Sequence, residues 1–171
     1  MYHGERFNAY SHLAGSMLAV AALVLMTVKA NGPYQLASAL TYGICLILLY
    51  LGSTLYHSIP QPKIKAILQK VDHCMIYLLI AGSYTPFTLI PLKGGWGWSL
   101  FGVSWGLALF GIIQELTIGR KSEKRLLSMM IYIIMGWLIL VAVSPLVRTL
   151  PFAGLFWLAL GGILYSADIY W

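Results

Sequence analysis

Charged residues, and acids above all, are scarce in this chain. Only 9% of its 171 residues are charged and only five are acidic, whereas soluble domains carry roughly 25% charge. Hydrophobic residues make up 60% of the sequence, and the mean hydropathy is +0.80. A soluble fold needs more polar side chains than this to cover its surface. The composition therefore indicates a membrane protein.

Cysteine is also rare, and alternating strand patterns are absent. Cys45 and Cys74 are the two cysteines, and each lies in an apolar segment. They form no disulfide framework and no CxxC metal motif, so we expect both to be small buried hydrophobes. Backbone groups in a bilayer must pair within their own segment, which favours helices.

Long apolar runs follow one another along the whole chain and predict an all-α, polytopic helical membrane bundle in a single domain, residues 1–171. A membrane-spanning helix needs about 20 apolar residues. Short connections make sequential helices antiparallel neighbours. The first run has no small-residue cleavage site before Lys29, so it is predicted as a span rather than as a signal peptide. The six predicted spans are Tyr10–Val28, Tyr34–Ile59, Val71–Leu92, Gly94–Gln114, Leu126–Val147 and Leu150–Ala167.

The cations are distributed unevenly between the two ends of the predicted spans. One end carries Arg6, Lys63, Lys65, Lys70, Arg120, Lys121, Lys124 and Arg125, and the other carries Lys29, Lys93 and Arg148. Cytoplasmic loops of membrane proteins are enriched in Lys and Arg, which predicts a multi-pass protein of the cell (inner) membrane with a cytoplasmic N-terminus. The cations form no basic face, so membrane lipids, and not nucleic acid, are the expected partners.

Small residues recur at the spacing that lets membrane helices pack closely. They include Gly102 and Gly106, four residues apart, and the pair Gly161–Gly162. We expect these glycines to pack inside the bundle, and the alternative is a face for a homo-oligomer.

Polar side chains are concentrated near one predicted end of the bundle. Ser53 and His57 are four residues apart and share a face of one helix. The predicted topology brings them to the same depth as His12, Asp72 and His73. Ionisable groups at membrane depth are costly, which favours a functional role over chance. Imidazole and carboxylate groups bind Zn²⁺, so this layer predicts a metal site or a proton relay. The alternative is that each residue is simply solvated at the membrane interface.

Three segments make the chain resemble a known family. Ser53–His57 (STLYH), Val71–Phe87 (VDHCMIYLLIAGSYTPF) and Asn8–His12 (NAYSH) are similar to motifs of the bacterial hemolysin III family, part of the progestin and adipoQ receptor (PAQR) superfamily. The resemblance extends over the whole chain. It implies seven helices and a cytoplasmic N-terminus, the latter in agreement with the distribution of cations.

The resemblance also implies a zinc ion near the inner leaflet. Carried over by motif, His57 would bind the metal, Asp72 would hold a zinc-bound water, and Ser53 would support the site. The superfamily includes ceramidases, which implies zinc-dependent hydrolysis of a lipid amide with Asp72 and Ser53 as catalytic residues. A role in membrane homeostasis or cytolysis is the other function that it implies. A transporter would carry its ionisable residues along a path across the membrane, and here they gather at one face.

One element of the family pattern is missing from this sequence. The chain ends at Trp171 without a His-x-x-x-His motif, which in the relatives lies on a seventh helix and supplies two zinc ligands. We therefore expect the sequence to be part of a longer protein whose seventh helix carries the remaining ligands. His12 and His73 are the available substitutes.

Overall fold

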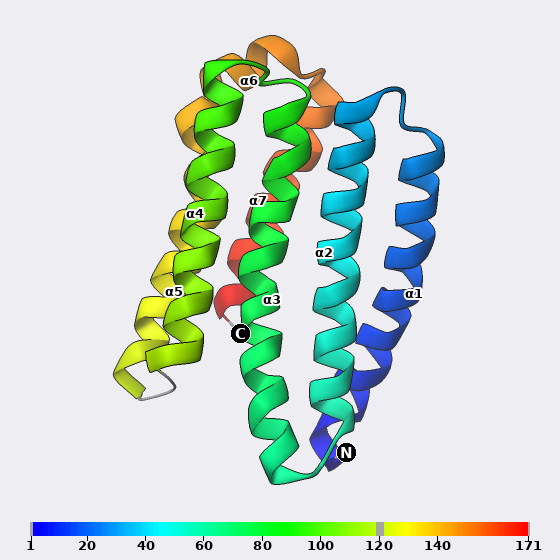
Figure 1. Ribbon diagram of the computed structural model, residues 1–171, viewed down its shortest axis with the longest axis vertical. Coiled ribbons are helices and arrows are strands. Elements are labelled where there is room, and N and C mark those ends of the chain that lie inside the picture. Colours follow the sequence, from blue (N-terminus) through cyan, green and yellow to red (C-terminus); the bar gives the residue numbers. More distant parts are fainter. Residues whose placement is uncertain (1, 119–121, 171) are drawn as a thin grey trace.

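The structure is a computed structural model that describes residues 2–118 and 122–170. Within these ranges it is all helical and contains no strand, which confirms the predicted fold class. The helices are numbered as in Figure 1. The long helices are α1 (Arg6–Val28), α2 (Pro33–Ser58), α3 (Pro62–Leu89), α4 (Gly95–Ile118), α5 (Ser122–Trp137) and α7 (Phe152–Tyr170). The short ones are η1 (His3–Glu5), η2 (Leu138–Ala142) and α6 (Val143–Thr149).

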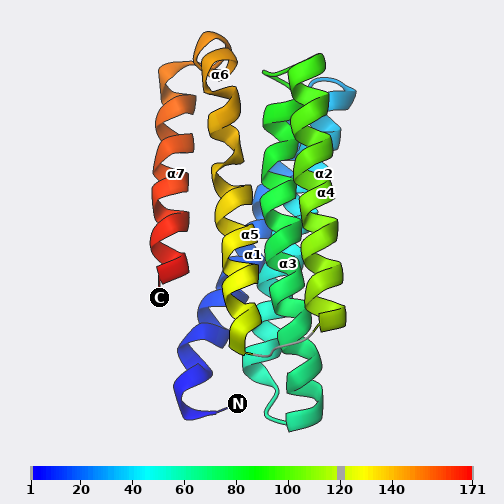
Figure 2. The ribbon, with the colours of Figure 1, turned by 90° about the vertical axis from the view of Figure 1, so that its left-hand side faces the viewer.

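The helices form a row of four with a second layer behind part of it. Helices α1 to α4 lie side by side in chain order and pack pairwise as antiparallel neighbours (Figure 1). Helix α5 packs against α3 and α4, and α7 packs against α5 (Figure 2). Helix α3 therefore lies at the centre of the bundle. Its Tyr77, Ile80 and Tyr84 form a buried core with side chains of α4 and α5. We call the end where α1 and α3 begin and α2 ends the amino-terminal end.

Proline and glycine set the boundaries between the first helices. Pro33 and Pro62 occupy the first helical positions of α2 and α3, where the fixed φ of proline is already helical. Gly32 and Gly94 have φ values of 105° and 95°, which side-chain-bearing residues rarely adopt. Helix α3 begins at Pro62 rather than at the predicted Val71. The connection from α2 is therefore only residues 59–61, shorter than the gap between the two predicted spans.

The segment predicted as one span, Leu126–Val147, is interrupted after Trp137. The Tyr84 hydroxyl donates to the Met135 carbonyl at 2.7 Å and accepts from the Ile139 amide at 2.8 Å. In a regular α-helix these two backbone groups would bond directly to each other. A side chain inserted into this bond explains the local 3-10 turn η2.

Helices α2 and α3 approach closely where Gly82 faces Cys45. A Cβ atom at Gly82 would lie 2.9 Å from the Cys45 sulfur, so glycine permits this packing distance. Cys45 and Cys74 are both free and buried, which confirms the expectation for the two cysteines.

The glycines predicted to pack closely do not touch another described helix. No atom lies within 4 Å of a Cβ placed at Gly102, Gly106 or Gly161–Gly162, and the last two line a cavity inside the bundle. A Cβ at Gly111, by contrast, would overlap the ring of Tyr77. Sequence spacing locates small residues, but it does not tell which face of a helix packs inward.

The outer surface is apolar, as lipid contact requires. Leu18 and Leu25 of α1 are 71% and 61% exposed, far more apolar exposure than a water-facing helix shows. Four described segments are long and apolar enough to cross a membrane, namely Arg6–Val28, Pro33–Ser58, Gly95–Thr117 and Leu126–Thr149. Phe152–Ala167 is apolar but shorter, and α3 carries several charges in its first turns.

Candidate functional site

Two polar clusters lie toward the amino-terminal end of the bundle. The first, which we call the α1–α2 cluster, consists of Glu5, His12, Ser53, His57 and Lys65. The second, the α3–α5 cluster, consists of His73, Gln114, Glu115 and Ser128. The predicted single layer of polar residues is therefore divided between two groups of helices.

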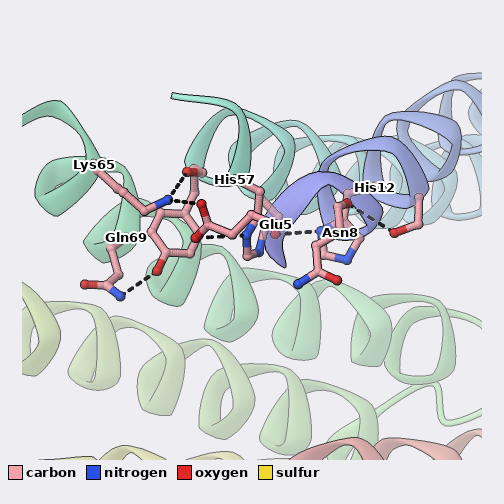
Figure 3. Close-up of polar contacts among 9 residues, drawn as sticks. Glu5, Asn8, His12, His57, Lys65 and Gln69 are labelled. Carbon is pink, nitrogen blue, oxygen red and sulfur yellow. Dashed lines mark hydrogen bonds and ion pairs between the residues drawn. The ribbon is translucent and has the colours of Figure 1, made fainter. Parts of the chain in front are cut away.

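Helices α1 and α2 bring His12, Ser53 and His57 together. His12 Nδ1 lies 2.7 Å from the hydroxyl of Ser53, which is only 5% exposed. Four residues along α2, His57 faces the same side, and its ring centroid is 5.8 Å from that of His12 in an edge-to-face arrangement. Figure 3 shows the two histidines and their polar neighbours.

Glu5 extends from the η1 turn to two residues of the α1–α2 cluster (Figure 3). Its carboxylate accepts a hydrogen bond from Lys65 Nζ at 2.8 Å, and its other oxygen lies 3.7 Å from His57 Nδ1. The hydrogen bond from Lys65 lowers the pKa of Glu5 below its ordinary value of 4.5, against a smaller opposing effect of burial. Glu5 is therefore ionised at neutral pH.

His57 is a partly buried imidazole with one ring nitrogen, Nδ1, that makes no hydrogen bond among the described residues. Its side chain is 15% exposed, and Nδ1 is buried without a hydrogen-bond partner among the described residues. A buried polar atom without a partner is costly. This nitrogen faces the Glu5 carboxylate at 3.7 Å, which leaves Nε2 as the ring nitrogen suited to a metal ion.

Asp72 and His73 behave differently from the α1–α2 cluster. Asp72 is half-buried and, among the described residues, makes no hydrogen bond or ion pair with Ser53 or His57. His73 turns toward α4, where its Nδ1 lies 3.1 Å from Glu115 Oε1. Adjacent helical residues point about 100° apart, which accounts for the separation. His73 therefore belongs to a different polar group from His12 and His57.

The α3–α5 cluster is a buried network around Glu115, which is 6% exposed. One carboxylate oxygen pairs with His73, and the other lies 3.2 Å from the Ser128 hydroxyl. The same hydroxyl lies 3.2 Å from the side-chain oxygen of Gln114. Tyr132 donates its hydroxyl to the His73 carbonyl at 3.1 Å. These contacts connect α3, α4 and α5.

A cavity of about 1710 Å³ opens between α2, α3, α5 and α7. Its polar lining includes Gln69, His73, Gln114, Glu115 and Ser128, and apolar side chains form most of the remainder. Neither His57 nor Asp72 lines it. The α3–α5 cluster therefore faces the cavity, and the α1–α2 cluster lies outside it.

The described residues do not gather three His, Cys, Asp or Glu side chains around one point that could hold a metal. The α1–α2 cluster contains two histidines, His12 and His57. They supply only part of the ligand set that a zinc site requires. The roles expected of His57, Asp72 and Ser53 toward zinc stay predictions.

The sequence analysis did not single out Glu5, Lys65 or Glu115 as site residues. A signal was present for Glu5, because it is the only acidic residue before Asp72 and lies close to the first apolar run. The burial of Glu115 required knowledge of which face of α4 meets α3.

Comparison with known proteins agrees with the membrane bundle and the motifs. The family profile described as "Haemolysin-III related" matches residues 1–170. Hemolysin-3 of Bacillus cereus is 46% identical over 165 residues, which cover 95% of this chain and 74% of that protein. A hemolysin-3 homolog of Bacillus subtilis (strain 168) is 45% identical, with 95% of this chain and 76% of the relative covered.

A human relative is more distant. The monocyte to macrophage differentiation factor of Homo sapiens is 27% identical over 173 residues, covering 95% of this chain and 68% of the human protein. No solved structure matches with significance. The profile match over nearly the whole chain, together with the two bacterial relatives, places this multi-pass membrane protein in the haemolysin III-related family.

Proposed function

We propose that this protein acts in membrane homeostasis or cytolysis through a zinc site at the cytoplasmic face of the cell membrane, with His57 as a ligand. The observation that carries this proposal is the partly buried His57 imidazole, which lies beside the His12 ring and whose Nδ1 faces the Glu5 carboxylate without a hydrogen bond among the described residues. The excess of Lys and Arg at the same end supports a cytoplasmic N-terminus.

The chain's own residues have distinct roles in this proposal. His57 supplies a ring nitrogen to the metal, and Ser53 keeps the neighbouring His12 ring in place through the 2.7 Å contact. Asp72, which is half-buried on α3, is proposed to hold a water near the metal. The remaining ligands are proposed to lie outside the described residues. When bound, zinc would supply a Lewis acid and lower the pKa of a coordinated water.

Zinc-dependent hydrolysis of a lipid amide, with Asp72 as general base and Ser53 in support, is the alternative function. The large cavity favours it, because apolar walls and a polar end suit a long-chain substrate. His57 and Asp72 are not among the described residues that line the cavity, whereas a hydrolytic site must touch its substrate. This favours the first function, in membrane homeostasis or cytolysis, over hydrolysis.

Membrane order in cells that produce the full-length protein distinguishes the two functions. The wild-type protein should change the fluorescence of a lipid-order probe. We expect His57→Ala to abolish this effect and Asp72→Asn to preserve it, with His73→Ala as a matched control.

If Asp72→Asn abolishes the effect, and if wild-type protein in vesicles also hydrolyses a long-chain lipid amide, the alternative function is correct. If His57→Ala preserves the effect, the zinc site is not responsible for it.

A further inference from the structure

Glu5 joins the start of the chain to the ends of two other helices. It lies in the η1 turn before α1, yet it contacts His57 near the end of α2 and Lys65 in the first turns of α3 (Figure 3). The side chains of Glu5, His57 and Lys65 are 21%, 15% and 16% exposed, so this contact is partly shielded from solvent. A carboxylate so placed has a specific effect on the imidazole beside it.

Lys65 is fixed on several sides, which in turn fixes Glu5. Its Nζ donates to the Glu5 carboxylate at 2.8 Å and to the Tyr56 carbonyl at 3.0 Å. The same ammonium lies 4.4 Å from the centroid of the Tyr56 ring and 5.3 Å from that of Tyr2. Tyr2 also donates its hydroxyl to the Pro60 carbonyl at 3.1 Å. The segment Tyr2–Glu5 is thereby held across the carboxyl-terminal end of α2.

A carboxylate close to one nitrogen of an imidazole biases the tautomer of that ring electrostatically, even at 3.7 Å and without a hydrogen bond. It favours the proton on the facing nitrogen and so leaves the lone pair on the other nitrogen. Histidines that bind metal commonly have such a carboxylate partner, which orients the ring and raises its basicity. Glu5 faces Nδ1 of His57, so the lone pair is directed to Nε2.

We infer that Glu5 is a positioning residue for His57: its carboxylate holds the proton on Nδ1 and presents Nε2 as the metal-binding atom. Lys65 and Tyr2 keep the carboxylate in place. The inference deepens the proposed function, on which its metal-binding part rests. The preference for one tautomer belongs to the metal-free protein and is measurable without zinc.

The variant Glu5→Gln tests this role, because it keeps the size of the side chain and removes its charge. Lys63→Gln is a matched control, since Lys63 is exposed on the same turns of α3 and makes no described contact with the cluster. Nitrogen-15 NMR of histidine-labelled, metal-free full-length protein reports the tautomer of His57. Competition with a chromophoric chelator then gives the affinity for Zn²⁺.

We expect Glu5→Gln to reduce the fraction of His57 that is protonated on Nδ1 and to weaken zinc binding by about 10–100-fold. Lys63→Gln should change neither quantity. If the wild-type protein binds no zinc but the tautomer still shifts in Glu5→Gln, the proposed zinc function fails and the positioning role stands. An unchanged tautomer in Glu5→Gln overturns the inference, whatever the zinc affinity, because Glu5 then acts only as a tether.

Discussion

The two polar clusters contain similar side chains but differ in how completely those side chains are paired. In the α3–α5 cluster, both oxygens of the buried Glu115 have partners, and the network joins three helices. In the α1–α2 cluster, Glu5 is shared between a lysine and an imidazole, and His57 Nδ1 makes no hydrogen bond within the described part of the chain. A fully paired buried network stabilises a fold, whereas a buried cluster with incomplete pairing is a candidate binding site.

Removal of the central carboxylate should produce the largest difference in stability between the clusters. Glu115→Ala leaves His73 and Ser128 without their shared partner inside the bundle, and we expect a loss of about 2–3 kcal/mol in the free energy of unfolding. Glu5→Ala breaks only a partly exposed pair and should cost less than about 1 kcal/mol. Thermal unfolding in detergent measures both. Equal losses would remove the distinction between the clusters.

Matched serine substitutions separate structure from metal binding. Ser53 and Ser128 are both buried, at 5% and 7% exposed, and each contacts a titratable side chain. We expect Ser53→Ala and Ser128→Ala each to lower stability by about 1 kcal/mol. Only Ser53→Ala should also weaken zinc binding, because it releases the His12 ring beside His57. Weaker zinc binding in Ser128→Ala would show that the two clusters act as one site.

The smallest expected effect is a pH dependence confined to the α1–α2 cluster. The hydrogen bond from Lys65 lowers the pKa of Glu5 below 4.5, so the pair stabilises the fold above that pH. Its contribution should decrease as the pH falls through the lowered pKa. The difference in thermal midpoint between wild type and Lys65→Met should therefore be present at pH 7 and shrink below about pH 4.5. A difference that is constant with pH would contradict the pairing.

Sequence patterns predicted the helical membrane bundle because apolar runs of sufficient length leave few other folds. The Ser53–His57 spacing placed both residues on one helical face, since that relation depends only on local geometry. The shared depth of His12 and His73 did not reveal that His73 pairs with Glu115, because the direction of each side chain around α3 depends on how the helices rotate against one another.

The contacts that the sequence did not predict arise from long-range packing. Glu115 is buried because α4 turns that face toward α3 and α5, which a nearly uniform apolar helix does not specify. The early start of α3 at Pro62 places Lys65 within reach of Glu5, 60 residues earlier in the chain. The break after Trp137 depends on the hydroxyl of Tyr84 from another helix.

The most direct test of the account is the zinc content of the full-length protein, purified in detergent as wild type, His57→Ala and His73→Ala. We predict about one zinc per chain in the wild type and in His73→Ala, and a loss of zinc in His57→Ala. Zinc retained in His57→Ala, or lost only in His73→Ala, would contradict the assignment of the metal site to the α1–α2 cluster.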